Sequence, residues 1–219
     1  MIATDLFPDV AETLALDAAP AVELQPLSLG DVLRAQRRGV AVLDTRSPRE
    51  FADGHLAGST HISLGAGFKD SAEALIPPEC PVALVAAPGR EEEAAAQLCG
   101  AGRDRVIGFL AGGIDAVGHL LVPVRHPAQI SGALLRQRLA RGPLTVIDVR
   151  DEAEWRRDGI PRSINIPLRH FRQRMAEIPD GPVVIYCWTG DLFFIAVSLL
   201  EQMGWMNVVV LVGGLADWR

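Results

Sequence analysis

The sequence predicts an α/β protein made of two tandem domains, each a mostly parallel sheet with helices on both faces. Three observations lead to this prediction. The chain repeats itself once, apolar strand-like segments alternate with helical ones in each copy, and a proline-rich stretch separates the copies. Strands that are apolar throughout are typical of a parallel sheet that helices cover on both sides.

The internal repeat sets the domain organisation. The segment VLDTRSPREFADGHLAGSTHISL (42–64) aligns without gaps on VIDVRDEAEWRRDGIPRSINIPL (146–168), and PVALVAAPGRE aligns on PVVIYCWTGDL. A repeat of about 100 residues has the size of a whole domain. We therefore expect the boundary in the stretch LLVPVRHPAQ. The expected parts are an N-terminal arm at 1–26, a first domain at 27–120 and a second domain at 121–219.

Each copy is expected to begin with the same helix. Ser28 and Ser131 precede the amphipathic segments DVLRAQRRG and ALLRQRLARG, which stop at Gly39 and Gly142. Serine is a favoured N-cap residue and glycine a frequent helix stop. The short buried strands VAVLD and LTVID follow these helices.

A shorter helix comes next. The sequence SPRE (47–50) is a capping box with proline at the first helical position, and the helix is expected to end at Gly54. Asp151 and Glu154 occupy the two capping positions in the second copy.

The remaining elements complete the sheets. The apolar strands VALVA and VVIYC are each followed by a helix, and the strands VIGFL and VVVLV both end in Gly-Gly. The strand-helix alternation predicts parallel pairing in both copies.

The composition excludes several classes of protein. The chain has 219 residues, a net charge of −6 and no basic block that could follow a nucleic-acid backbone. Its N-terminus lacks the basic and apolar regions of a secretory signal, and no stretch could span a membrane. The three cysteines form no CxxC pair, so neither a disulfide framework nor a metal site is indicated. A cytoplasmic location is expected.

Cys187 is the candidate nucleophile, because it directly follows the apolar strand VVIY and precedes a turn and a helix. Ligands of open α/β sheets bind outside the carboxyl ends of the strands. Backbone N–H groups of such a turn and helix start favour a thiolate, which is the nucleophilic form. Cys80 and Cys99 are expected to be apolar fillers. The expected cradle around the sulfur consists of Trp188, Thr189, Gly190, Asp191 and Leu192.

These residues resemble the rhodanese (sulfurtransferase) family. The resemblance rests on VIDVRDEAEW, SINIPL, VVIYC with its glycine turn, and the terminal LVGGLADW. It implies that Cys187 takes a sulfane sulfur from thiosulfate or a persulfide and passes it to a thiol or cyanide, without a cofactor. The implied partners are small sulfur donors and thiol acceptors.

The two copies are also similar to the C-terminal inactive and active rhodanese pair of persulfide dioxygenase fusions, through GHLAGSTHISL and LVAAPGREEEAAAQL. That resemblance implies a sulfide-oxidising partner protein. The five histidines show no HxHxDH cluster, so we expect no iron and no dioxygenase activity.

Both copies depart from the family pattern. Ala86 stands at the position of Cys187, so the first domain is expected to be inactive. Leu192 stands where many single-domain members have an arginine, and the acidic Asp191 precedes it. Anion binding should therefore be weaker, unless a neighbouring arginine such as Arg150, Arg156 or Arg162 supplies the missing charge.

The pairs Asp44 with Arg46 and Asp148 with Arg150 end equivalent strands in both copies. Because the inactive copy has the pair too, a structural ion pair is expected.

The sequence offers two alternatives to a sulfurtransferase. The first, a cysteine phosphatase, is disfavoured, because it would need an arginine in the loop after Cys187 to bind a phosphate dianion, and this loop has none. A non-catalytic binding or regulatory module, or a persulfide carrier, is the alternative that Ala86, Leu192 and Asp191 favour.

Overall fold

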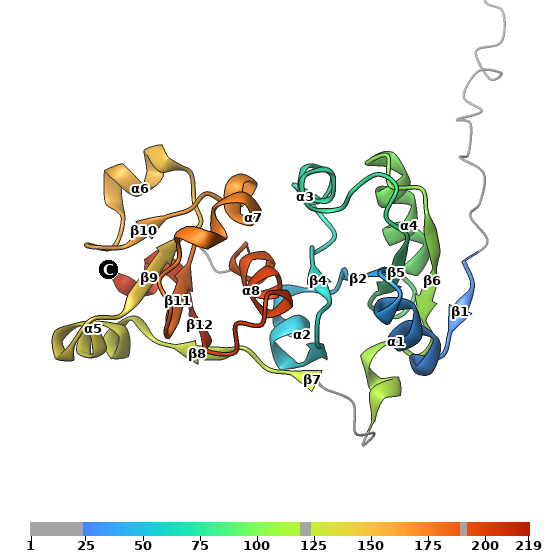
Figure 1. Ribbon diagram of the computed structural model, residues 1–219, viewed down its shortest axis with the longest axis horizontal. Coiled ribbons are helices and arrows are strands. Elements are labelled where there is room, and N and C mark those ends of the chain that lie inside the picture. The colour runs from blue at the N-terminus through green and yellow to red at the C-terminus, as the bar shows by residue number, and fades with distance from the viewer. Residues whose placement is uncertain (1–23, 119–123, 189–191) are drawn as a thin grey trace, which may run out of the picture.

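The computed structural model describes residues 24–118, 124–188 and 192–219. Within them the chain forms two α/β domains that lie side by side (Figure 1). The first contains β1 (Pro26–Leu27), α1 (Leu29–Arg37), β2 (Ala41–Asp44), α2 (Pro48–Asp53), β3 (His55–Leu56), β4 (Thr60–His61), α3 (Phe68–Leu75), β5 (Val82–Val85), α4 (Glu91–Gly100), β6 (Val106–Leu110) and the 3-10 helix η1 (Gly113–Val117).

The second domain has a similar order of elements. It is preceded by β7 (Val124–Arg125) and contains β8 (Ala128–Ile130), α5 (Gly132–Arg141), β9 (Thr145–Asp148), α6 (Glu152–Asp158), β10 (Ile164–Asn165), η2 (Leu168–His170), α7 (Phe171–Arg174), η3 (Met175–Glu177), β11 (Val183–Tyr186), α8 (Phe193–Gln202), β12 (Val208–Leu211) and α9 (Gly214–Trp218). Here η2, α7 and η3 stand in the place of α3.

Each domain has a five-stranded sheet among the described residues. The strand orders are β1-β6-β5-β2-β4 and β10-β9-β11-β12-β8, and every neighbouring pair in them is parallel. The predicted α/β class and parallel sheets are therefore confirmed. β5 and β11, which directly precede Ala86 and Cys187, are the central strands.

The predicted helix starts are also confirmed. The hydroxyl oxygens of Ser28 and Ser131 accept hydrogen bonds from the backbone of Asp31 and Leu134. Ser47 and Glu50 form the reciprocal capping box that begins α2. These contacts satisfy backbone N–H groups that have no partner inside the helix.

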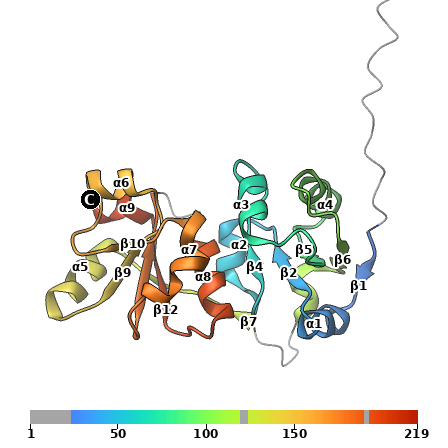
Figure 2. The same ribbon diagram turned by 45° about the horizontal axis from the view of Figure 1, so that its top comes forward.

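The link between the domains forms a separate two-stranded sheet with the first domain and then enters the sheet of the second. β7 pairs antiparallel with β3 of the first domain, with His55 opposite Arg125, and β8 then joins the second sheet. Figure 2 shows β7 beside the first domain and α8 next to α2 and β4.

The domains share one hydrophobic core. Phe51, Ile62 and Phe68 of the first domain pack in the same buried cluster as Phe194 and Ile195 of α8. α8 is buried from Phe193 to Leu200, so it lies inside the molecule rather than on its surface. No helix among the described residues combines the length and the apolar character that a membrane span requires.

Candidate active site

Cys187 lies at the carboxyl end of β11, the central strand of the second sheet. Its residue is 2% exposed. Alternate side chains of a strand point to opposite faces of the sheet. Val183, Ile185 and Cys187 accordingly belong to the core shared by both domains, whereas Tyr186 belongs to the separate core on the other face. The Cys187 side chain therefore lies on the face of the sheet that α8 covers.

The start of α8 lies just after the cysteine in the chain. α8 begins at Phe193 and has no acidic residue in its first turn. The N-terminus of a helix carries partial positive charge and stabilises an anion close to it. Thr189, Gly190 and Asp191, which belong to the predicted cradle, lie outside the described residues.

The two described cradle residues lie at the surface. Trp188 is 41% exposed and Leu192 is 50% exposed. The guanidinium carbon of Arg150 lies 5.8 Å from the Trp188 ring centroid, and that of Arg219 lies 5.1 Å from it. Such distances are typical of cation–π contacts, which fix the orientation of the indole.

Arg150 is tied to two carboxylates. Its side chain is hydrogen-bonded to Asp148 at 2.7 Å and to Asp158 at 3.0 Å. Burial by itself lowers the pKa of Arg150, but the bonds and charges of these carboxylates outweigh that effect and raise it. Arg46 and Asp44 form the same buried pair in the first domain, with a distance of 2.6 Å. The predicted structural ion pairs are therefore present in both copies.

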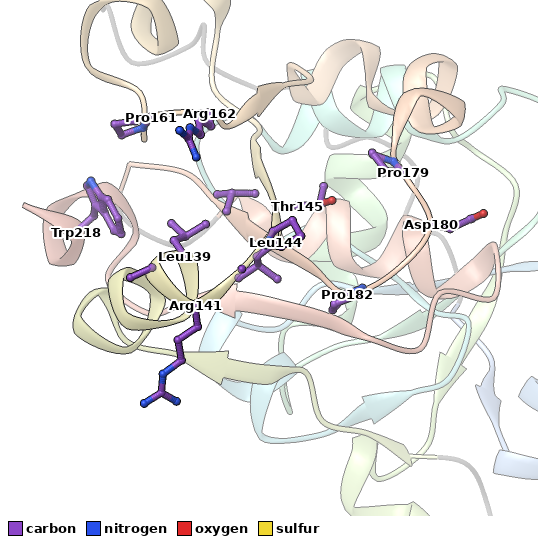
Figure 3. A pocket seen from close by; sticks show the side chains of 14 residues that line it. Leu139, Arg141, Leu144, Thr145, Pro161, Arg162, Pro179, Asp180, Pro182 and Trp218 are labelled. Atoms are coloured by element: carbon purple, nitrogen blue, oxygen red, sulfur yellow. The ribbon is translucent and has the colours of Figure 1, made fainter.

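The other candidate cations are placed elsewhere. Arg156 pairs with Glu152 on the exposed face of α6. Arg162 lines a cavity of about 1100 Å³ together with Thr145, Pro182 and Trp218 (Figure 3). Thr145 begins β9 and Pro182 immediately precedes β11, so this cavity opens at the amino ends of the strands. The cavity and Cys187 therefore lie at opposite ends of the strands.

Two supporting residues near Cys187 were not identified from the sequence. The hydroxyl oxygen of Tyr186 accepts a hydrogen bond from the backbone of Ile160 at 2.9 Å and lies 3.1 Å from Oγ of Ser163. Burial of the ring raises the pKa of Tyr186. These contacts fix the residue that precedes the sulfur. The only signal in the sequence was the single tyrosine of the chain, inside an apolar strand.

Gly214 is the second supporting residue. It has a φ of +59°, and a Cβ there would lie 2.4 Å from the carbonyl oxygen of Cys187. The backbone N–H of Leu215 donates to that same oxygen at 2.9 Å. The Gly-Gly turn therefore lets α9 start directly against the cysteine backbone, because a side chain would not fit.

The equivalent position of the first domain has different surroundings. Ala86 is buried at the end of β5, and the helix that follows begins with Glu91, Glu92 and Glu93. Three carboxylates at a helix start oppose an anion in the position of the missing sulfur. An adjoining cavity of about 620 Å³ is lined by Ala86 and by charged residues that include Arg46 and Asp115.

Two of the histidines and the other two cysteines are placed as follows. His55 and His61 lie in the interior of the first domain, at its contact with α8. Cys80 and Cys99 are half-buried. Over the ranges that the structure describes, no group of three His, Cys, Asp or Glu side chains is arranged to hold a metal ion.

Comparisons with known proteins agree with the repeat. A model of the rhodanese-like domain matches residues 28–119 and 131–219. The chain is 37% identical over 92 residues to a sulfurtransferase of Allochromatium vinosum, covering 41% of this chain and 86% of the relative. It is 44% identical over 89 residues to an HTH-type transcriptional regulator of Mycobacterium tuberculosis, covering 39% of this chain and 38% of that protein.

Among solved structures, a rhodanese-related protein from Thermoplasma volcanium is similar at 32% identity, with a TM-score of 0.38. That match covers 42% of this chain and 89% of the other. The family model covers most of the chain and matches it twice. The chain therefore belongs to the rhodanese family and carries two rhodanese-like domains in tandem.

Proposed function

We propose that this protein is a sulfurtransferase in which Cys187 carries a sulfane sulfur as a persulfide between a donor and a thiol or cyanide. One observation carries the proposal. Cys187 directly follows the central strand of the second sheet, ahead of a helix whose first turn has no acidic residue, whereas the first domain has Ala86 and three glutamates in the corresponding places.

The reaction has two steps. The Cys187 thiolate attacks the outer sulfur of the donor, the donor S–S bond breaks, and sulfite or a thiolate leaves with the bonding pair. A thiol or cyanide then attacks the outer sulfur of the Cys187 persulfide and releases the thiolate. Each step forms one bond to sulfur and breaks one, so no oxidant or metal is consumed.

The chain's own residues have supporting roles in this proposal. The α8 N-terminus stabilises the thiolate and the persulfide anion. Gly214 and Leu215 fix the Cys187 carbonyl, and Arg150 and Arg219 hold the Trp188 ring. Because Asp148 and Asp158 balance the charge of Arg150, we assign it a positioning role ahead of the predicted anion-binding role.

The test is intact mass after incubation with thiosulfate or, separately, with glutathione persulfide. The wild type is expected to gain one sulfur that cyanide or a thiol removes, a check needed because sulfinic acid adds nearly the same mass. Cys187→Ser should gain none, whereas Cys80→Ser and Cys99→Ser should behave as the wild type. A folded wild type that gains no removable sulfur from either donor contradicts the proposal.

A non-catalytic module or persulfide carrier is the second candidate. The 2% exposure of Cys187 and the exposed Leu192 in place of a cation favour it. The similarity of the chain to part of a transcriptional regulator is in line with a regulatory use of this domain. A carrier would accept sulfur on Cys187 but release it only to a partner protein, such as a sulfide-oxidising enzyme, and not to cyanide or small thiols.

A further inference from the structure

A pocket of about 350 Å³ lies between the two domains, next to the helix that follows Cys187. The second domain contributes Leu192 and Ile195 to its wall. The first domain contributes the rest, which is Pro48, Ile62, Ser63, Leu64, Gly65, Ala66, Gly67, Phe68 and Ser71. The volume is in the range of pockets that hold small molecules.

The wall of this pocket is uncharged. Among the described residues that line it, none is acidic or basic, and the hydroxyls of Ser63 and Ser71 are its polar side-chain groups. The cavity beside Ala86 differs, because charged side chains line it. A dianion such as thiosulfate would lose water here without gaining a cation, whereas an apolar group would gain by leaving water.

The pocket and the sulfur are on the same side of the second sheet. Cys187 packs in the same buried cluster as Ile62, Phe68 and Ile195, which are also wall residues of the pocket. Leu192 is 50% exposed and forms the N-cap of α8. A molecule that binds against Leu192 therefore lies at the start of α8, the helix that follows Cys187 in the chain.

We infer that this interdomain pocket binds the uncharged, apolar body of the thiol whose sulfur is exchanged at Cys187, so that the preferred donor is the persulfide of an apolar thiol and not thiosulfate. The inference rests on the proposed sulfurtransferase function. It gives the first domain a part in choosing the substrate, although that domain has no nucleophile of its own.

The transfer from such a donor is balanced. The Cys187 thiolate forms a bond to the outer sulfur of R–S–S–H, the S–S bond of the donor breaks, and R–S⁻ leaves with the electron pair. Cys187 then carries S–S–H, and the released thiolate takes a proton from water. No oxidant or reductant takes part.

The test compares two donors of similar size that differ in charge, benzyl persulfide and 2-sulfonatoethyl persulfide, with thiosulfate as a third. The readout is the rate of cyanide-removable sulfur gain on Cys187. The wild type is expected to react at least about tenfold faster with benzyl persulfide than with either anionic donor. Equal rates, or a preference for an anion, would overturn the inference.

Two variants test the pocket itself. Ala66→Trp places a large ring in the wall and should slow the benzyl donor at least about tenfold while changing the sulfonatoethyl donor less than about twofold. Ala74→Trp is the matched control, because Ala74 is an exposed alanine of α3 outside the pocket wall, and it should match the wild type.

The outcomes separate the two proposals. If sulfur still reaches Cys187 but Ala66→Trp slows both persulfides equally, or neither, the pocket inference is wrong and the sulfurtransferase function stands. If a folded wild type takes no sulfur from any of the three donors, the proposed function fails, and the inference fails with it.

Discussion

A carboxylate oxygen of Glu201 in α8 lies 2.8 Å from Nε2 of His55 in the first domain. Nδ1 of the same ring lies 3.1 Å from the carbonyl oxygen of Phe51, and the ring stacks on the Phe51 side chain at 3.7 Å. His55 is fully buried, and each of its ring nitrogens has an oxygen atom within hydrogen-bond distance. The contact ties the first domain to the helix that follows the cysteine.

Replacing Glu201 by alanine should therefore destabilise the protein. The substitution leaves a buried ring nitrogen without a partner, which costs about 1–3 kcal/mol in the free energy of unfolding. Urea unfolding would measure the loss, with Glu92→Ala on the exposed face of α4 as the control. Equal stability of the two variants would show that the interdomain contact contributes nothing.

Gly214→Ala should impair sulfur transfer more than Gly113→Ala does. Both glycines have a φ of +59°, so an alanine would be strained at each. An added Cβ lies 2.4 Å from the Cys187 carbonyl oxygen at Gly214, but 3.6 Å from the Ala86 carbonyl oxygen at Gly113. We expect at least about a tenfold lower rate of sulfur gain for Gly214→Ala alone. Comparable rates in the two variants would contradict this role of Gly214.

His61 should make the protein less stable as the pH falls. Burial lowers the pKa of His61 from 6.5 to about 4. Well above pH 6.5 the ring is neutral in both the folded and the unfolded state and adds no pH dependence. Between pH 6.5 and about 4 the unfolded chain takes up a proton that the folded protein excludes, so the free energy of unfolding falls, by up to about 3 kcal/mol.

Urea unfolding at pH 7.5 and pH 4.5 would measure this effect. His61→Gln keeps a donor for the carbonyl oxygen of Arg46, which Nε2 contacts at 3.1 Å, and it should lose less stability on acidification than the wild type. His170→Gln, at an exposed histidine, should lose as much as the wild type. The same acid-induced loss in both variants would rule out His61 as its source.

Ala86→Cys should not create a second sulfur site. The new thiol would precede α4, whose first turn carries Glu91, Glu92 and Glu93, and these carboxylates disfavour a thiolate. In a Cys187→Ser background, the double variant is expected to gain sulfur at least about tenfold more slowly than wild-type Cys187. A rate near that of the wild type would mean that the cysteine alone, and not its surroundings, separates the two copies.

The local structure was predictable because short-range signals determine it. Ser28, Ser131 and the SPRE capping box begin helices where they were expected to, since a side-chain oxygen and its N–H partner lie within one turn. The alternation of apolar strands and helices was sufficient to predict two parallel sheets. The place of Cys187 directly after a buried strand follows from the same pattern.

Contacts between distant segments were not predictable in this way. His55 and Glu201 are 146 positions apart, and neither residue has a neighbour in the sequence that indicates the other. The fit of Gly214 against Cys187 depends on how α9 starts after β12, which hydrophobic periodicity does not report. The uncharged pocket combines Pro48, residues 62–68 and Ser71 of the first domain with Leu192 and Ile195 of the second, and only the docking of the two domains brings them together.

The core that the two domains share also limits how this protein can change. Phe51, Ile62 and Phe68 cover α8, so the second domain alone would expose a wide apolar face to water. The packing of the first domain does not depend on a cysteine at position 86, but the cover of α8 does depend on these three side chains. Sequence drift in this half of the chain should therefore be fast around Ala86 and slow along the surface that covers α8. An attempt to excise the second domain as an independent enzyme should yield an aggregating fragment.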